Sequence, residues 1–214
     1  MPRQMPGLQA EFHRQVAEAM KLAEIGEVAR EEARAGSQTR RHLHYARIEL
    51  LYELAFLRAF LAWEAFLEQA FHRYLCGYAS KHGAAKPQAG QSFSPTLAHA
   101  EAAVLGGKDY VAWHNALKVA NRSQGMFASC VIETVLRSNV ARLEDCAAVR
   151  HRIAHSQTDA RRKFDAATMA IAGRRYKGAR AGRFLRDHDV GTTPPVRWLE
   201  RLGQELQGLA AQIA

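Results

Sequence analysis

The sequence predicts an all-α fold, and two observations carry that prediction. Hydrophobic residues make up 48% of the 214 positions, alanine is abundant, and there are only six prolines. In the long segments the apolar residues recur every three to four positions, which is the period of an amphipathic helix. Alanine favours helices, and a chain of this length can bury a sizeable core. We therefore expect one helical domain with terminal extensions over residues 1–214.

Two long helices are expected first. Residues 8–35 place apolar side chains on one face and acidic and basic ones on the other, which indicates a helix packed on the core. Residues 40–79 carry an apolar band too wide for a simple surface helix, so this segment should be a central helix or one shared with a second subunit. The Gly- and Pro-containing stretch 80–95 is predicted to be a loop.

Shorter helices should follow. Their expected ranges are 96–105, ended by Gly106, then 108–121 and 127–136, although Cys130–Val131–Ile132 would also suit a short strand. Ser138 or Asn139 can cap a further helix that leads to residue 154, and Thr158 or Asp159 can cap one through residue 172. The last helix, 194–214, begins at a pair of prolines and has an apolar stripe.

The segment Val149–His155 is dense in titratable groups. Arg150 shares a helix face with Cys146 and Ile153, so its guanidinium lies on the apolar side, where a surface arginine has no reason to be. His155 ends the same run. Arginine offers a permanent charge and a planar fork for phosphate, and histidine exchanges a proton near neutral pH. The pair suits phosphate chemistry.

Arg150-x4-His155, with Ile153–Ala154 before the histidine, resembles the motif of HEPN domains, small all-α domains of which many are metal-independent ribonucleases. His151 departs from the family pattern, in which asparagine is commonest after the arginine. The segment from Trp63 to Glu68 is similar to an aromatic–acidic segment of some subfamilies. The resemblance covers residues 43–160 and implies a HEPN-like helical bundle with a core over about 40–172.

The resemblance also implies an activity. Two subunits would bring Arg150 and His155 together across a two-fold interface, forming a composite active site for 2′-hydroxyl-assisted RNA cleavage without metal or other cofactor. His151 is an auxiliary candidate, as is Glu64, which either orients Arg150 or reaches solvent. Many family members act as toxins or antiviral defence components, so an antitoxin or a nucleotidyltransferase-like protein is an expected partner.

A basic segment follows the motif. Residues 161–186 contain nine of the Lys and Arg residues and one acid, which places +8 of the formal net charge of +9 there. Such clustering favours contact with nucleic acid, although a solvated basic segment without a ligand is the alternative. Tyr176 and Phe184 lie among these residues and could stack on bases. The RNA-binding candidates are Arg161, Arg162, Lys163, Arg174, Arg175, Lys177, Arg180 and Arg183.

Other readings stay open. His151 and His155 have the i, i+4 spacing of metal ligands, but Arg150 and Arg152 would oppose a cation, so no metal is expected. A non-catalytic RNA-binding or oligomerisation module is an alternative in which Arg150 pairs with Glu144, Asp145 or Glu64. A DNA-binding regulator is a third.

Several classes of enzyme have no visible support in the sequence. It contains no phosphate-binding glycine loop, no nucleophile elbow and no C-x-x-C motif. Three scattered cysteines, Cys76, Cys130 and Cys146, indicate reduced thiols and a cytoplasmic location. No secretory signal or membrane-spanning run is visible.

Overall fold

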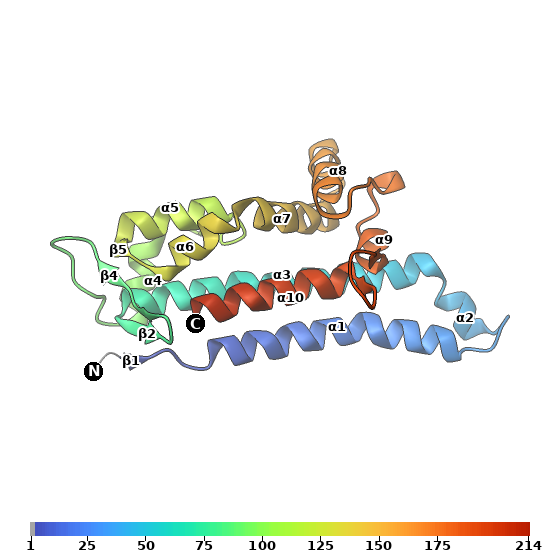
Figure 1. The fold of residues 1–214 in the computed structure, drawn as a ribbon, viewed down its shortest axis with the longest axis horizontal. Coiled ribbons are helices and arrows are strands. Elements are labelled where there is room, and N and C mark those ends of the chain that lie inside the picture. The colour runs from blue at the N-terminus through green and yellow to red at the C-terminus, as the bar shows by residue number, and fades with distance from the viewer. Residues whose placement is uncertain (1–2) are drawn as a thin grey trace. The chain divides into compact units, whose positions relative to one another are not determined.

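The computed structural model describes residues 3–214 and confirms the all-α expectation. The described residues form α-helices and one short 3₁₀ helix, η1 (Lys177–Ala179). The α-helices are α1 (Leu8–Glu32), α2 (Gln38–His42), α3 (Tyr45–Leu75), α4 (Leu97–Leu105), α5 (Ala116–Met126), α6 (Val131–Ser138), α7 (Val140–Ala154), α8 (Thr158–Ala172), α9 (Ala181–Arg186) and α10 (Trp198–Ile213) (Figure 1).

Side-chain caps explain where several helices begin. The hydroxyl of Thr96 accepts a 3.2 Å hydrogen bond from the His99 amide at the start of α4. Asn115 Oδ1 accepts a 2.9 Å bond from the Lys118 amide, which sets the start of α5. The expectation of a helix over 108–121 is therefore wrong in its first half, because the cap lies at Asn115 and the preceding residues are non-helical.

Short strands, which the sequence did not indicate, connect the helices. β1 (Arg3–Gln4) pairs in parallel with β2 (Tyr78–Ser80), which pairs with β3 (Gly83–Ala84). β4 (Lys86–Pro87) pairs with β5 (Phe127–Ser129), and β6 (His188–Asp189) pairs with β7 (Val196–Arg197). The predicted buried helix over 127–136 is thus a strand followed by α6. β1 and β2, and likewise β4 and β5, lie far apart in the sequence, and strands of two or three residues show no alternating pattern.

The described chain divides into two compact units. Unit 1 comprises residues 3–12, Trp63–Glu144 and Gln207–Ala214, and unit 2 comprises His13–Ala62 and Asp145–Leu206. The unit boundaries fall within α1, α3, α7 and α10. None of the described helices is long and apolar enough to cross a membrane.

Unit 1 has an aromatic core. Phe12 packs against Phe66 with ring centroids 5.4 Å apart, and Phe71 packs against Phe127 at the same distance. The Tyr74 hydroxyl donates a 2.6 Å hydrogen bond to the carbonyl of Ile213, and burial raises the pKa of Tyr74 to about 12. This bond attaches the end of the chain to α3.

Unit 2 packs its helices closely at glycines. A side chain at Gly26 of α1 would meet Leu51 of α3, and one at Gly203 of α10 would meet Met20 of α1. Gly182 of α9 approaches the Glu49 backbone of α3 even more closely, because a Cβ there would lie 2.2 Å from the Glu49 carbonyl oxygen. α1, α3, α9 and α10 therefore form one packed group, which supports the basic residues of the 174–197 region.

Candidate functional site

The two motif histidines lie side by side at the end of α7. The His155 amide donates a 2.9 Å hydrogen bond to the His151 carbonyl, and the two ring centroids are 4.5 Å apart. His155 is exposed and His151 is half-buried. Burial lowers the pKa of His151, and the neighbouring His155 and Lys163 lower it further. His151 is therefore neutral near pH 7 and can accept a proton.

Arg150 lies on α7 and is only partly accessible to solvent. The residue is half-buried, its Nε atom is shielded from solvent, and Cys146 and Val149 on the same helix are buried. The guanidinium was expected on the apolar side of the helix, and in the structure its Nε is shielded while the residue as a whole is half-buried. Glu64 is also half-buried, but it belongs to unit 1 and Arg150 to unit 2. The expected orientation of Arg150 by Glu64 stays a prediction.

Arg152 has a role that the sequence did not reveal. Its Nε donates a 2.9 Å hydrogen bond to the carbonyl of Ala179, and its Nη1 donates a 2.9 Å bond to the carbonyl of His155. Ala179 has a φ of 48°, in the left-handed region, so the chain turns sharply there. Arg152 thus holds the histidine end of α7 to the turn in the basic segment.

The first turn of α8 carries three adjacent exposed cations. Asp159 accepts hydrogen bonds from Arg162 at 2.9 Å and pairs with Lys163 Nζ at 2.8 Å. Hydrogen bonds from Lys163 and Arg162 lower the pKa of Asp159 to about 2. Arg161 is exposed as well. Asp159 therefore pairs with two of the three cations, and the start of α8 keeps a net positive charge.

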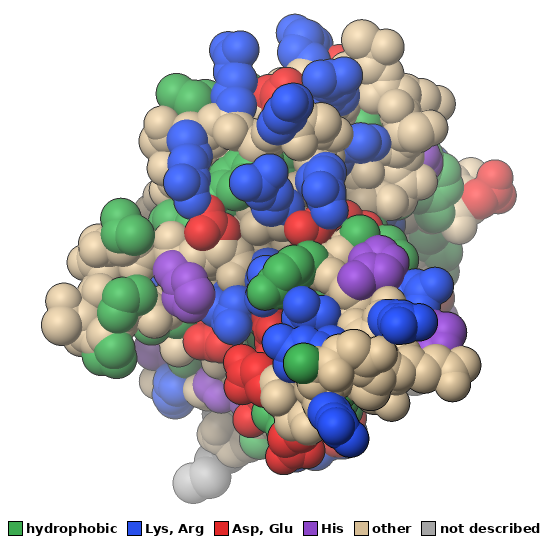
Figure 2. All heavy atoms as spheres, turned by 90° about the vertical axis from the view of Figure 1, so that its right-hand side faces the viewer, with side chains coloured by type: hydrophobic (Ala, Val, Ile, Leu, Met, Phe, Trp, Pro, Cys, Tyr) green, Lys and Arg blue, Asp and Glu red, His purple; other side chains and the backbone are tan. Residues whose placement is uncertain are grey.

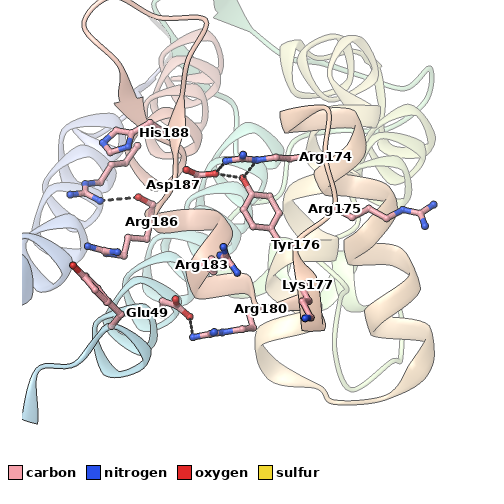
Figure 3. A pocket seen from close by; sticks show the side chains of 12 residues that line it. Glu49, Arg174, Arg175, Tyr176, Lys177, Arg180, Arg183, Arg186, Asp187 and His188 are labelled. Carbon is pink, nitrogen blue, oxygen red and sulfur yellow. Dashed lines mark hydrogen bonds and ion pairs between the residues drawn. The ribbon is translucent and has the colours of Figure 1, made fainter. Parts of the chain in front are cut away.

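A cavity of about 730 Å³ opens in unit 2, and we call it the basic pocket. Helix α9 and the segments before and after it supply most of its wall, with two residues from the start of α3 (Figure 3). Figure 2 shows Lys and Arg side chains spread over one face of the molecule. The lining residues are Tyr45, Glu49, Arg174, Arg175, Tyr176, Lys177, Arg180, Arg183, Arg186, Asp187, His188 and Arg197.

Acidic partners hold four of the pocket's arginines. Arg174 pairs with Asp187, and Arg180 pairs with Glu49. Arg186 and Arg197 both reach Glu27, at 2.6 and 3.4 Å. In contrast, the side chains of Arg175, Lys177 and Arg183 form no hydrogen bond or ion pair with any residue in 3–214. These three exposed cations are the uncompensated charge of the pocket.

The expectation that Tyr176 and Phe184 stack on bases is wrong. Both rings are buried, with centroids 5.4 Å apart, and Phe184 also stacks on Trp198. The Tyr176 hydroxyl donates a 2.6 Å hydrogen bond to Asp187. Both rings therefore pack in the core of unit 2, although Tyr176 also forms part of the pocket lining.

The predicted RNA-binding residues form two groups. Arg174, Arg175, Lys177, Arg180 and Arg183 line the basic pocket, whereas Arg161, Arg162 and Lys163 lie on α8 outside its lining. Sequence reasoning missed Tyr45 and Arg197 as lining residues, because they lie far from the basic segment in the chain. Among residues 3–214 no group of three His, Cys, Asp or Glu side chains is placed to hold a metal ion.

Comparisons with protein-family models, with curated proteins and with solved structures give no match to this chain.

Proposed function

We propose that this protein is a metal-independent endoribonuclease that cleaves RNA as a homodimer, with Arg150 and His155 of both copies in one active site. One observation carries the proposal: an exposed imidazole, His155, stands 4.5 Å by ring centroids from a second, His151, at a helix end that also bears Arg150. A neutral imidazole, a second imidazole and a guanidinium are the groups that RNA transesterification needs.

The chemistry would proceed without a cofactor. A neutral imidazole takes the proton of a ribose 2′-hydroxyl, whose oxygen then attacks the neighbouring phosphorus. The bond from phosphorus to the 5′-oxygen breaks, and the leaving oxygen takes a proton from a second, protonated imidazole. The products are a 2′,3′-cyclic phosphate and a 5′-hydroxyl end. Arg150 would stabilise the extra negative charge on the phosphate in the transition state.

His151 and His155 can divide these tasks. The lowered pKa of His151 favours it as the base near neutral pH, and His155 would then be the group that faces the leaving oxygen. The second copy would contribute its own Arg150 and His155 to the same active site across the two-fold interface. The cations of α8 would bind the flanking phosphates.

A leucine stripe on α3 supplies a surface for the second copy. Leu50, Leu54, Leu57 and Leu61 are spaced by four, three and four residues and so share one helix face. Leu50 and Leu54 are each 55% exposed, and Leu61 is 47% exposed. This spacing is typical of a helix seam between two chains.

A second candidate is a non-catalytic RNA-binding module. The shielded Nε of Arg150 favours it, because a guanidinium that packs into the helix layer can serve the fold alone. In this case the basic surface would bind RNA and nothing would be cleaved.

An assay of labelled-RNA cleavage in buffer with a chelator distinguishes the ribonuclease from the non-catalytic RNA-binding module. We expect His155→Ala and Arg150→Lys each to lower the rate by at least about a hundredfold while RNA binding persists. His44→Ala, at an exposed histidine outside α7 and outside the lining of the basic pocket, controls for loss of a histidine. The products should carry 2′,3′-cyclic phosphates. Cleavage that survives in both variants, or that requires a metal ion, would exclude the proposed site.

The cellular setting follows from this activity. A cytoplasmic ribonuclease of this kind would act as a toxin or an antiviral defence component, controlled by an antitoxin or a nucleotidyltransferase-like protein. Growth arrest on expression, absent with His155→Ala, is the expected result. Equal growth arrest with both proteins would refute this setting.

A further inference from the structure

The basic pocket has features beyond a surface that binds RNA. It is a concave space of about 730 Å³, a size ordinary for small-molecule sites. Its wall is built from residues 174–197 and the start of α3, so most of it lies outside the segment that carries the ribonuclease motif. Any ligand here would bind independently of the catalytic histidines.

Free and held cations are arranged differently in this wall. Arg174, Arg180 and Arg186 are fixed by acidic partners and keep the rim in place. Figure 3 shows Arg183 among them, while Arg175 turns away from the others. Lys177 and Arg183 therefore contribute uncompensated charge beside arginines that acidic partners hold in place. The arginines held by acids are already ordered, so they lose little side-chain entropy when an anion binds.

The two tyrosine rings of the pocket already have contacts of their own. Arg30 lies 4.0 Å and Arg186 4.5 Å from the centroid of the Tyr45 ring. Tyr176 is buried against Phe184 and lies under Arg174 at 5.2 Å. Base stacking, which dominates recognition of single-stranded RNA, would therefore depend on the exposed His188 ring of the lining.

We propose that the basic pocket binds a compact small molecule with clustered phosphates and recognises it through those phosphates alone. Adjacent phosphates place several negative charges within one cavity, which several guanidinium groups and one ammonium can meet together. An RNA strand would present its phosphates one by one along an extended backbone. The proposal is independent of the ribonuclease activity.

Titration calorimetry with inorganic tripolyphosphate tests this, with orthophosphate and ATP as comparisons. We expect tripolyphosphate to bind much more tightly than orthophosphate, ATP to bind within about tenfold of tripolyphosphate, and both affinities to fall with salt. Lys177→Ala and Arg183→Ala should each weaken tripolyphosphate binding by about tenfold or more. Arg183→Lys should retain part of the affinity.

Arg34→Ala is the matched control, because Arg34 is exposed and outside the pocket lining. Thermal unfolding will show that the exposed pocket variants are folded. Equal tripolyphosphate binding in the control and pocket variants would overturn the proposal. So would ATP binding far more tightly than tripolyphosphate, since the base would then be read. Binding of single-stranded RNA that depends on Arg183, with no tripolyphosphate binding, would assign the pocket to RNA and also overturn it.

Discussion

Glu27 on α1 accepts a 2.6 Å hydrogen bond from Arg186 Nε on α9, although the residues are 159 positions apart. The carboxylate also accepts a 3.0 Å bond from the Tyr52 hydroxyl of α3, and Arg197 lies 3.4 Å away. Glu27 is only 8% exposed. One buried acid therefore joins α1, α3, α9 and β7 behind the basic pocket.

Removal of this acid should destabilise unit 2. Glu27→Ala leaves Arg186 and the Tyr52 hydroxyl without their shared acceptor, and loss of one partner from a buried ion pair costs about 3 kcal/mol. Glu31→Ala is the control, because Glu31 lies on the same helix and is exposed. Urea unfolding measures the free energy of unfolding of both variants. Equal stabilities of the two variants would show that the Glu27 cluster contributes nothing to folding.

The same carboxylate predicts how stability depends on pH. Burial would raise the pKa of Glu27, but hydrogen bonds and charges of Arg186, with Tyr52 and Arg197, bring it below its ordinary value of 4.5. A group whose pKa is lower in the folded chain stabilises the fold fully above its unfolded pKa, and this contribution is lost as pH falls through the folded pKa. Wild-type stability should therefore fall more steeply below about pH 4.5 than that of Glu27→Gln. Parallel curves from urea unfolding would contradict this.

Gly182 tests how closely α9 must approach α3. A Cβ at this position would lie 2.2 Å from the Glu49 carbonyl oxygen and 2.6 Å from the carbonyl carbon, so backbone must move. The Gly182 amide also donates a 2.8 Å hydrogen bond to Glu53. We expect Gly182→Ala to cost about 1–3 kcal/mol and to displace Arg183 in the basic pocket.

Gly208→Ala provides the opposite case. It lies in α10, and nothing is within 4 Å of an added Cβ. Replacement of a helical glycine by alanine at an open position stabilises by about 0.5–1 kcal/mol. Thermal unfolding compares the stabilities of Gly182→Ala and Gly208→Ala with that of wild type. A Gly182→Ala protein as stable as wild type would mean that α9 can shift without cost.

Helices could be predicted from the sequence because their signals are local. The expected range of α8 agrees with the structure, and the ends of α4 follow from Thr96 and Gly106, whose caps are read within a few residues. Strands of two or three residues carry no such period. Their partners can also lie far apart in the sequence, as Arg3 and Tyr78 do.

The candidate site was predictable to a similar degree. The motif run placed His151 and His155 one turn apart on a helix, and the basic segment gave most of the charged wall of the pocket. Arg197, Glu27 and Tyr45 could not be found this way, because tertiary contacts alone bring them to the segment. Composition also suggested stacking aromatics, but burial turned Tyr176 and Phe184 inward.

The leucine stripe of α3 makes the proposed dimer testable. Leu54 is 55% exposed, so Leu54→Glu should leave the fold of the single chain intact. In a dimer that buries this face, the carboxylate would lose its water, at a cost of several kcal/mol. We expect sedimentation analysis to show a dimer for wild type, a monomer for Leu54→Glu, and loss of RNA cleavage with the dimer.

Leu117→Glu is the control for this experiment, because Leu117 is 41% exposed on α5 and outside the stripe. It should leave both dimer and cleavage unchanged. Mixing Leu54→Glu protein with excess wild type should not restore its activity, whereas two dimer-competent variants, Arg150→Lys and His155→Ala, should exchange subunits and recover part of the cleavage. This complementation requires that the two copies contribute to one site. A monomeric wild-type protein that cleaves RNA would refute the composite active site, and a Leu54→Glu dimer would place the interface on another face.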